Sequence, residues 1–266
     1  MKTSTLVIII VIAAIIVAGF LLFSKKQPEP QPQSQQNQQQ EATIKLASKE
    51  GMGQFMTDKN GMTLYYFPKD NINQSNCTGQ CVTAWPMYYT DNVIVSSPLK
   101  KEDFGSITRE DGAKMTTYKG WPLYYYFQDK VAGDTLGEGV GNVWYIVPEP
   151  FYTIMTQNKD AVGGNYLVDP RGMTLYYFTR DTHGTATTTP VSVCTDACLA
   201  AWPVFYTDNV IAPSLLKKTD FSTITRADGS KQLVYKGWPL YYYAVDKNPG
   251  DTLGENVNGV WFVVKP

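Results

Sequence analysis

Four cysteines are the residues of this chain whose chemistry is easiest to name. They occur as Cys77-x3-Cys81 and Cys194-x3-Cys198, and each pair is followed by a Trp-Pro dipeptide. In an oxidising compartment such close pairs form local disulfides, and closing so short a loop stabilises a fold by about 2 kcal/mol. A zinc site needs four ligands, which only both pairs together would supply. The spacing therefore favours two disulfides, with a shared zinc site or cycling thiols as alternatives.

Acidic residues recur in a loop that reads DKxxGDTLGE. Oxygen ligands on a glycine-containing loop are what Ca²⁺ binds in an extracellular protein. The spacing is not that of an EF-hand, and Asp-Gly loops commonly bind their own backbone instead. We therefore expect loop capping, with a Ca²⁺ site as the alternative. The carboxylates of the two copies are Asp129, Asp134 and Glu138, and Asp246, Asp251 and Glu255.

Catalytic combinations of residues are hard to find in this chain. Its one histidine, His183, lies in a Thr- and Gly-rich stretch that only the second copy of the repeat contains. A hydrolytic pair of carboxylates would have to lie close together in the folded protein, which spacing in the sequence alone does not establish. The sequence predicts a non-enzymatic protein with no cofactor, apart from the Ca²⁺ alternative.

The composition excludes a nucleic-acid-binding protein. The net charge is −1, and neither Lys nor Arg forms a long run, so nothing would attract a polyanion. A hydrophobic fraction of 43% with 18% charged residues suits a globular fold with a sizeable core. Aromatic residues make up 13%, led by 18 Tyr, and they favour β-structure because rings pack well on a pleated sheet.

A tandem duplication positions these residues. The stretch YKGWPLYYY occurs at 118–126 and again at 235–243. Residues 77–147 align without a gap with 194–264, and about 45 of the 71 positions are identical. The sequence therefore predicts two homologous domains, 42–150 and 151–266.

A shorter motif, Tyr-x-aromatic-x-x-Asp, occurs twice in each predicted domain, as if a smaller unit had been duplicated earlier. We expect its rings to pack in the core and its Asp residues to accept hydrogen bonds from buried Tyr hydroxyls. An exposed aromatic platform for glycans is the alternative. The motif residues are Tyr65, Phe67 and Asp70; Tyr124, Tyr126 and Asp129; Tyr176, Phe178 and Asp181; and Tyr241, Tyr243 and Asp246.

Turn residues between β-forming runs predict antiparallel hairpins in both domains. FMTDKNGMTLYYF and REDGAKMTTYKGWPLYYY each place two β-rich arms around a Gly-containing turn. VWYIVP and VWFVVKP are expected to be closing strands, and a short helix is expected around each cysteine pair. The predicted fold is mainly β, with two small antiparallel domains in tandem behind one N-terminal transmembrane helix.

The first residues predict a membrane anchor and a stalk. Residues 6–23 form an uncharged apolar run, and its length is close to that which a bilayer requires. Bulky residues follow at the place where a signal peptidase needs small ones. We expect an uncleaved anchor over 1–24, with a cleaved signal peptide as the alternative. Residues 25–41, rich in Pro and Gln, predict an extended stalk. The C-terminal domains would then lie on the extracytoplasmic side, where the sequons at Asn73 and Asn76 fit.

These motifs resemble a family of secreted or lipoprotein repeats marked by Tyr-x-aromatic-x-x-Asp. The resemblance rests on the motifs GMTLYYFPKD, CTGQC, AWP, KGWPLYYY and GDTLGE and on their counterparts in the second copy, over residues 51–266. The resemblance implies an extracytoplasmic, membrane-associated protein with two tandem copies and no established activity. The chain departs from the pattern in lacking a lipid-accepting Cys after its apolar run.

Together these features predict a single-pass protein of the cell membrane with a binding or structural role at the cell envelope. Its partners would be the membrane, through the N-terminal helix, and an envelope polymer or a surface protein. Two similar domains on one tether also indicate bivalent binding of a repetitive partner. The alternative function is that of a Ca²⁺-binding or thiol-redox surface protein.

Overall fold

The structure, a computed structural model, describes residues 40–266. The predicted transmembrane helix and all but the last residues of the predicted stalk lie outside this range. Within it, no helix has the length and apolar character needed to span a bilayer. The contacts group residues 40–266 into one unit. We refer to residues 40–150 as the first half and 151–266 as the second half; the predicted domain boundaries stay predictions.

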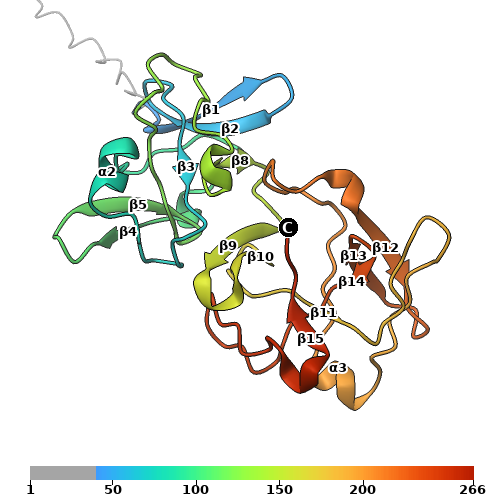
Figure 1. Cartoon of the computed structure of the whole chain (residues 1–266). Coiled ribbons are helices and arrows are strands. Elements are labelled where there is room, and N and C mark those ends of the chain that lie inside the picture. The colour runs from blue at the N-terminus through green and yellow to red at the C-terminus, as the bar shows by residue number, and fades with distance from the viewer. Residues whose placement is uncertain (1–39) are drawn as a thin grey trace, which may run out of the picture. The chain divides into compact units, whose positions relative to one another are not determined.

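Short antiparallel strands make up both halves, as the sequence predicts (Figure 1). Pairing joins β1, β2 and β8, then β3 with β7, and β4, β5 and β6; in the second half it joins β9 with β10, β11 with β15, and β12, β13 and β14. The strands of the first half are β1 (Ile44–Lys49), β2 (Gly53–Asp58), β3 (Tyr65–Tyr66), β4 (Phe104–Thr108), β5 (Lys114–Tyr118), β6 (Trp121–Pro122), β7 (Tyr145–Ile146) and β8 (Pro148–Glu149). Those of the second half are β9 (Met155–Lys159), β10 (Gly164–Val168), β11 (Tyr176–Phe178), β12 (Phe221–Thr225), β13 (Lys231–Tyr235), β14 (Trp238–Pro239) and β15 (Trp261–Val263).

The hairpin of β4 and β5 shows how the sequence sets a turn. Gly112 adopts φ 81°, a left-handed value that suits glycine. The Asp111 carboxylate accepts the backbone N–H of Ala113, 3.0 Å away, so the turn satisfies its own polar groups. The register pairs Phe104 with Tyr118, and β12 and β13 repeat it with Phe221 opposite Tyr235.

The other predicted hairpin is only partly formed. Asp58 and Gly61 make the expected turn, because Gly61 N–H donates to the Asp58 carbonyl at 3.0 Å. The arms then pair at a single bridge, between Thr57 and Thr63. β2 pairs instead with β1 and β8, and β3 pairs with β7. The predicted turn is therefore confirmed, but partners distant in the sequence pair with most of the strand edges.

The helices are short and two of them carry cysteines, as predicted. α2 and α3 each begin just after the first cysteine of a pair and end at the Trp of the Trp-Pro dipeptide. The helical segments are α2 (Gln80–Ala84) and α3 (Ala197–Ala201), with 3-10 turns η1 (Lys101–Asp103), η2 (Val140–Asn142), η3 (Asp160–Val162), η4 (Lys218–Asp220) and η5 (Val257–Gly259).

The core consists of three apolar clusters. One lies in the first half around Phe55 and Trp85, and one in the second half around Leu167 and Leu233. The third and largest contains residues of both halves. The duplicated units are therefore joined by a shared apolar core.

Candidate functional site

The first tyrosine of each motif is hydrogen-bonded to the motif aspartate of the neighbouring repeat. Tyr65 Oη donates to Asp129 Oδ2 at 2.7 Å, and Tyr124 Oη donates to Asp70 Oδ2 at 2.7 Å. All four residues are buried, so the hydroxyls satisfy the carboxylates out of contact with water. The second half forms the same crossed pairs, Tyr176 with Asp246 and Tyr241 with Asp181, both at 2.6 Å.

The backbone brings the crossed pairs together. Tyr65 N–H donates to the Tyr124 carbonyl at 2.9 Å, and Tyr124 N–H donates back to the Tyr65 carbonyl at 2.9 Å. The two repeats of one half thus meet at these tyrosines, and each tyrosine hydroxyl donates to the aspartate of the other repeat. This arrangement gives the motif a structural role.

The remaining motif rings extend a four-ring stack. Phe67 stacks on Trp144 at 4.1 Å, Trp144 on Trp85 at 3.7 Å, and Trp85 on Tyr126 at 4.2 Å between ring centroids. Such pairs contribute about 0.5–1.5 kcal/mol each beyond the area that they bury. The matching rings in the second half are Phe178, Trp261, Trp202 and Tyr243. A glycan platform built from these motif rings is therefore not what the fold presents.

The repeated YKGWPLYYY stretch is a packing unit, as expected. Tyr125, between the two motif tyrosines of this stretch, donates to Asp58 at 3.0 Å. Tyr126 joins the ring stack. The buried residues of the stretch are Tyr118, Trp121, Pro122, Leu123 and Tyr124.

The buried aspartates hold protons more tightly than exposed ones. Burial raises the pKa of Asp70 to about 7, while hydrogen bonds from the Asn76 N–H and the Tyr124 hydroxyl oppose the shift. Burial likewise raises the pKa of Asp129, Asp181 and Asp246, against the hydrogen bond from the partner tyrosine.

Both cysteine pairs form the predicted disulfides. Cys77 is bonded to Cys81 and Cys194 to Cys198, each with Cα atoms 5.3 Å apart. Each disulfide spans the start of a helix whose C-cap is Trp85 or Trp202. The crosslinks therefore anchor the helix that carries one ring of the stack.

The acidic loop residues bind their own backbone. Asp134 has a lowered pKa because the N–H groups of Lys130 and Val131 donate to it. Glu138 accepts the N–H of Ile146 at 2.7 Å, and Asp129 accepts that of Leu136 at 3.0 Å. Their counterparts Asp246, Asp251 and Glu255 bind Leu253, Lys247 with Asn248, and Val263 in the same way.

The described residues do not bring metal-binding side chains together. Within residues 40–266, no three His, Cys, Asp or Glu side chains lie close enough to hold an ion together. His183 is exposed, and its Nε2 lies 2.9 Å from the Lys236 carbonyl. The residues proposed for Ca²⁺ therefore cap loops.

One glycine in this loop is fixed by packing. A Cβ on Gly137 would lie 2.8 Å from the Tyr65 ring and 2.9 Å from the Trp85 ring. The Gly137 N–H also lies 3.2 Å from the Tyr65 hydroxyl. Gly254 has the same relation to Tyr176 and Trp202.

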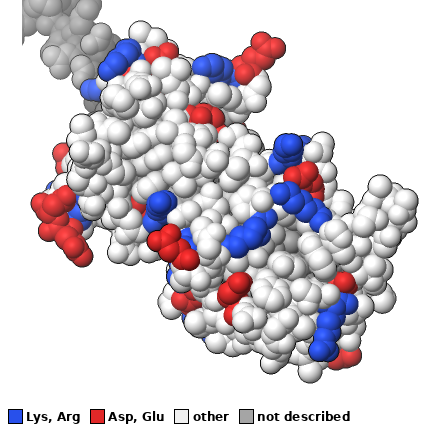
Figure 2. All heavy atoms as spheres, in the orientation of Figure 1, with Lys and Arg blue, Asp and Glu red and all other residues white. Residues whose placement is uncertain are grey.

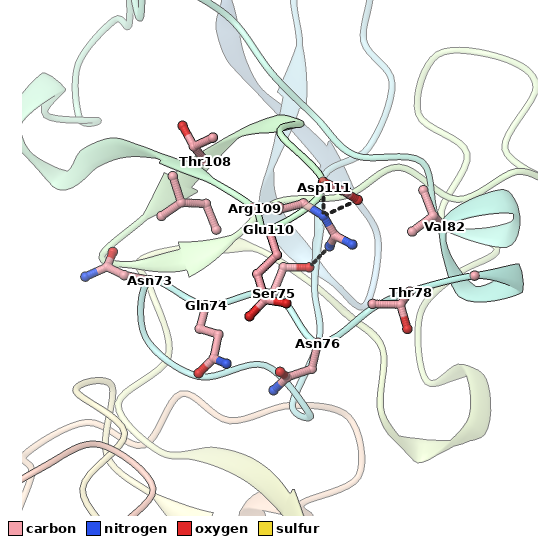
Figure 3. A pocket seen from close by; sticks show the side chains of 12 residues that line it. Asn73, Gln74, Ser75, Asn76, Thr78, Val82, Thr108, Arg109, Glu110 and Asp111 are labelled. Atoms are coloured by element: carbon pink, nitrogen blue, oxygen red, sulfur yellow. Dashed lines mark hydrogen bonds and ion pairs between the residues drawn. The ribbon is translucent and has the colours of Figure 1, made fainter.

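A polar pocket of about 610 Å³ opens in the first half (Figure 3). Three segments form it: the loop 73–79 that leads to the first disulfide, the end of β4 with the following turn, and Val82 of α2. The sequence gives little indication of this pocket, since most of the lining residues belong to no motif. The lining residues are Asn73, Gln74, Ser75, Asn76, Thr78, Gly79, Val82, Ile107, Thr108, Arg109, Glu110 and Asp111.

Arg109 is the most deeply placed charge in this pocket. Its side chain is 6% exposed, and its Nε lies 3.2 Å from Asp111 Oδ2. Nη1 donates to Ser75 Oγ (Figure 3), and Ser75 Oγ lies 2.7 Å from the Tyr124 hydroxyl. The pocket thus connects directly to the Tyr124–Asp70 pair.

The second half gives its equivalent arginine more partners. Arg226 Nη1 donates to Ser192 and, at 2.7 Å, to Gln232 Oε1, while Nη2 donates to the Cys194 carbonyl. In the first half the position of Gln232 is occupied by Met115. Among the described residues, no hydrogen bond forms from Arg109 Nη2. The two halves are therefore not equivalent as binding sites.

The pocket carries mixed charges. Glu110 and Asp111 line it beside Arg109, and amide side chains supply both donors and acceptors. The visible face of the molecule likewise shows acidic and basic side chains interspersed on a largely uncharged surface (Figure 2). A signal for the site exists in the sequence only as a contrast between the copies, TREDGAKM against TRADGSKQ.

Comparison with known proteins identifies the repeats. A family model described as a secreted repeat of unknown function matches residues 47–88, 105–148, 159–206 and 222–265. The repeat count is therefore four, and the predicted two copies are each a pair of repeats. No curated protein and no solved structure matches the chain. Because the four matches cover more than half of its length, the chain belongs to this family of secreted repeats of unknown function.

Proposed function

We propose that the protein is a non-enzymatic binding protein of the cell envelope. In this proposal residues 6–23 anchor it in the membrane, residues 25–41 form a stalk, and residues 42–266 face the extracytoplasmic side. The secreted family and the two disulfides support that location. The polar pocket of the first half would bind neutral sugar units of an envelope polymer.

The observation that carries this proposal is the free Nη2 of Arg109. In the second half Arg226 Nη1 donates to Gln232 and Nη2 donates to the Cys194 carbonyl, whereas the solvent-accessible Nη2 of Arg109 makes no hydrogen bond among the described residues. The first half keeps the same arginine and leaves one edge of its guanidinium open. A ligand hydroxyl at this edge would supply the missing acceptor.

The chemistry of the pocket favours a neutral polyhydroxyl ligand over an anion. Arg109 is paired with Asp111, and Glu110 adds a second negative charge, so an anion would meet no net positive field. The planar amides of Asn73, Gln74 and Asn76 line the pocket; amides donate and accept at once, as adjacent sugar hydroxyls require.

The binding test uses the full-length chain in detergent micelles and an array of neutral and acidic oligosaccharides. We expect a neutral oligosaccharide to bind, and Gln74→Ala and Glu110→Ala to weaken it, because both exposed side chains line the pocket. Asp208→Ala, at an exposed position of the second half, is the matched control. Binding only of acidic sugars, or binding that neither pocket variant weakens, would refute the proposed site.

The anchor is tested separately. Membranes that contain the full-length protein are washed with alkaline carbonate, and the molecular mass of the protein that stays in the membranes is measured. An integral protein with residues 1–24 intact is expected. Release into the wash, or a mass that shows cleavage after the apolar run, would indicate a signal peptide instead.

A further inference from the structure

The second half presents an open row of aromatic rings, which we call the aromatic strip. It comprises Phe262, Tyr177, Trp238 and His183. Successive ring centroids lie 5.9, 5.0 and 4.6 Å apart. The first three rings are half-buried and His183 is exposed. A pocket of about 350 Å³ lies along the strip and is lined by Tyr177, His183, Tyr235 and Trp238, among others.

The same row is covered in the first half. Its counterparts Tyr145, Tyr66 and Trp121 are at most 1% exposed. The Tyr66 ring centroid lies 5.8 Å from that of Tyr145 and 5.7 Å from that of Trp121, similar to the spacings in the strip. The duplication therefore supplies one covered and one open copy of a single surface.

The covering chain in the first half has a definite chemistry. It is the segment PEPFYT (148–153), whose Tyr152 ring lies 5.6 Å from that of Tyr66. Its Phe151 packs edge-on against Tyr118 at 5.0 Å. Nearby, the Pro170 carbonyl accepts a 3.0 Å hydrogen bond from Trp121 Nε1. Proline and aromatic residues thus make this contact.

The open copy keeps the groups that make these contacts. Tyr235 and Trp238 replace Tyr118 and Trp121 without change of type. Among the described residues, Trp238 Nε1 donates no hydrogen bond, and a half-buried indole N–H ordinarily finds an acceptor. Lys236 and Lys265 border the pocket. In the first half the equivalent Lys119 opposes the rise that burial gives the pKa of Glu149, within PEPFYT.

We propose that the aromatic strip is a docking site for an extended segment of a partner protein that carries proline and glutamate before aromatic residues. Extended proline-containing peptides dock on aromatic grooves in which an indole N–H meets a backbone carbonyl. The two lysines attract the glutamate. This site is separate from the polar pocket, so the two proposals stand or fall independently.

A second copy of this chain fits the strip less well. The positions equivalent to Phe151 and Tyr152 are Glu41 and Ala42, since Thr43 and Thr153 make matching hydrogen bonds to the carbonyls of Asn92 and Asn209. Lys59 stands where the second half has Pro170. The exposed edge of the first half therefore lacks the rings and the proline that cover the equivalent row, Tyr145, Tyr66 and Trp121.

The test measures binding of a fluorescent peptide, VPEPFYT, to the full-length protein in lipid nanodiscs. We expect a dissociation constant between about 1 μM and 1 mM, and a loss of about tenfold or more in Trp238→Ala. Phe127→Ala is the matched control, because Phe127 is an exposed ring of the first half, 46% accessible. The peptide VPEPAAT should bind no better than background.

A second variant protects the test against misfolding of Trp238→Ala. The double substitution Lys236→Glu and Lys265→Glu changes two exposed side chains and should also weaken peptide binding. No binding of VPEPFYT at about 1 mM, or binding that neither variant weakens, overturns the proposal. Dimerisation or oligosaccharide binding that depends on Trp238, without peptide binding, overturns it in favour of a second copy or a glycan.

Discussion

Tyr65 donates a 2.7 Å hydrogen bond to Asp129, a residue 64 positions further along the chain and in the next repeat. The reciprocal bond from Tyr124 to Asp70 closes the exchange. One repeat therefore cannot satisfy its own motif. This explains why the repeats occur as pairs, with each pair sharing one ring stack.

Removal of one hydroxyl tests this exchange. Tyr65→Phe leaves the buried Asp129 carboxylate without its side-chain donor, so the free energy of unfolding should fall by about 1–3 kcal/mol. Tyr206→Phe is the control, because Tyr206 makes a 2.7 Å bond to Asp208 on the surface, and its loss should cost less than about 0.5 kcal/mol. Equal effects in urea unfolding would contradict a structural role for the crossed pair.

The raised pKa of Asp70 predicts a pH dependence. The carboxyl has a pKa near 3.8 when unfolded and about 7 when folded, so between these pH values the folded state holds a proton that the unfolded state does not. The contribution to stability is complete below about pH 4 and is lost as the pH rises towards 7. Urea unfolding of the wild type and Asp70→Asn across this range should differ progressively. A difference that stays constant with pH would contradict the shift.

The disulfides should stabilise both halves to a similar extent. Replacement of Cys77 and Cys81 by alanine should lower the free energy of unfolding by about 2 kcal/mol, the value expected for so short a loop. The matched variant replaces Cys194 and Cys198. Thermal unfolding with and without reductant checks both; a variant that loses no stability, or a wild type that reductant leaves unchanged although its thiols react, would count against this role.

Gly137 should not tolerate a side chain. In Gly137→Ala the new methyl group would overlap the rings of Tyr65 and Trp85, which should cost about 1–3 kcal/mol. Gly105→Ala is the control, since its methyl group would meet only the Thr117 hydroxyl, at 3.1 Å, on an exposed strand. Equal melting temperatures for the two variants would show that the rings can move aside.

The sequence was most informative where spacing is local. It predicted the Cys77–Cys81 and Cys194–Cys198 disulfides, the Asp-Gly turn of the hairpin within REDGAKMTTYKGWPLYYY and the packing role of the motif rings. It could not show that Tyr65 reaches Asp129, because spacing does not reveal which of two identical motifs is the partner. It also predicted two copies where the family model finds four repeats.

The polar pocket and the aromatic strip could not have been predicted from the sequence. Arg109 and Arg226 look equivalent in the alignment, and only the groups around them show that Arg226 has hydrogen-bond partners, Gln232 and the Cys194 carbonyl, that Arg109 lacks. Trp121 and Trp238 are likewise identical in type, but only Trp121 has an acceptor from the following repeat, the Pro170 carbonyl. Such differences arise from tertiary contacts.

The most direct test of the proposed function is to give Arg109 the additional side-chain partner that Arg226 has in the second half. In Met115→Gln the new amide should accept from Arg109 Nη1, as Gln232 accepts from Arg226 Nη1, and donate to the Leu123 carbonyl, as Gln232 does to Leu240 at 2.9 Å, so that the guanidinium is held by the protein and is less available to a ligand. Calorimetric titration with the neutral oligosaccharide should then show binding weakened by about tenfold or more, with stability kept or raised. Unchanged binding to a folded Met115→Gln protein would contradict the account.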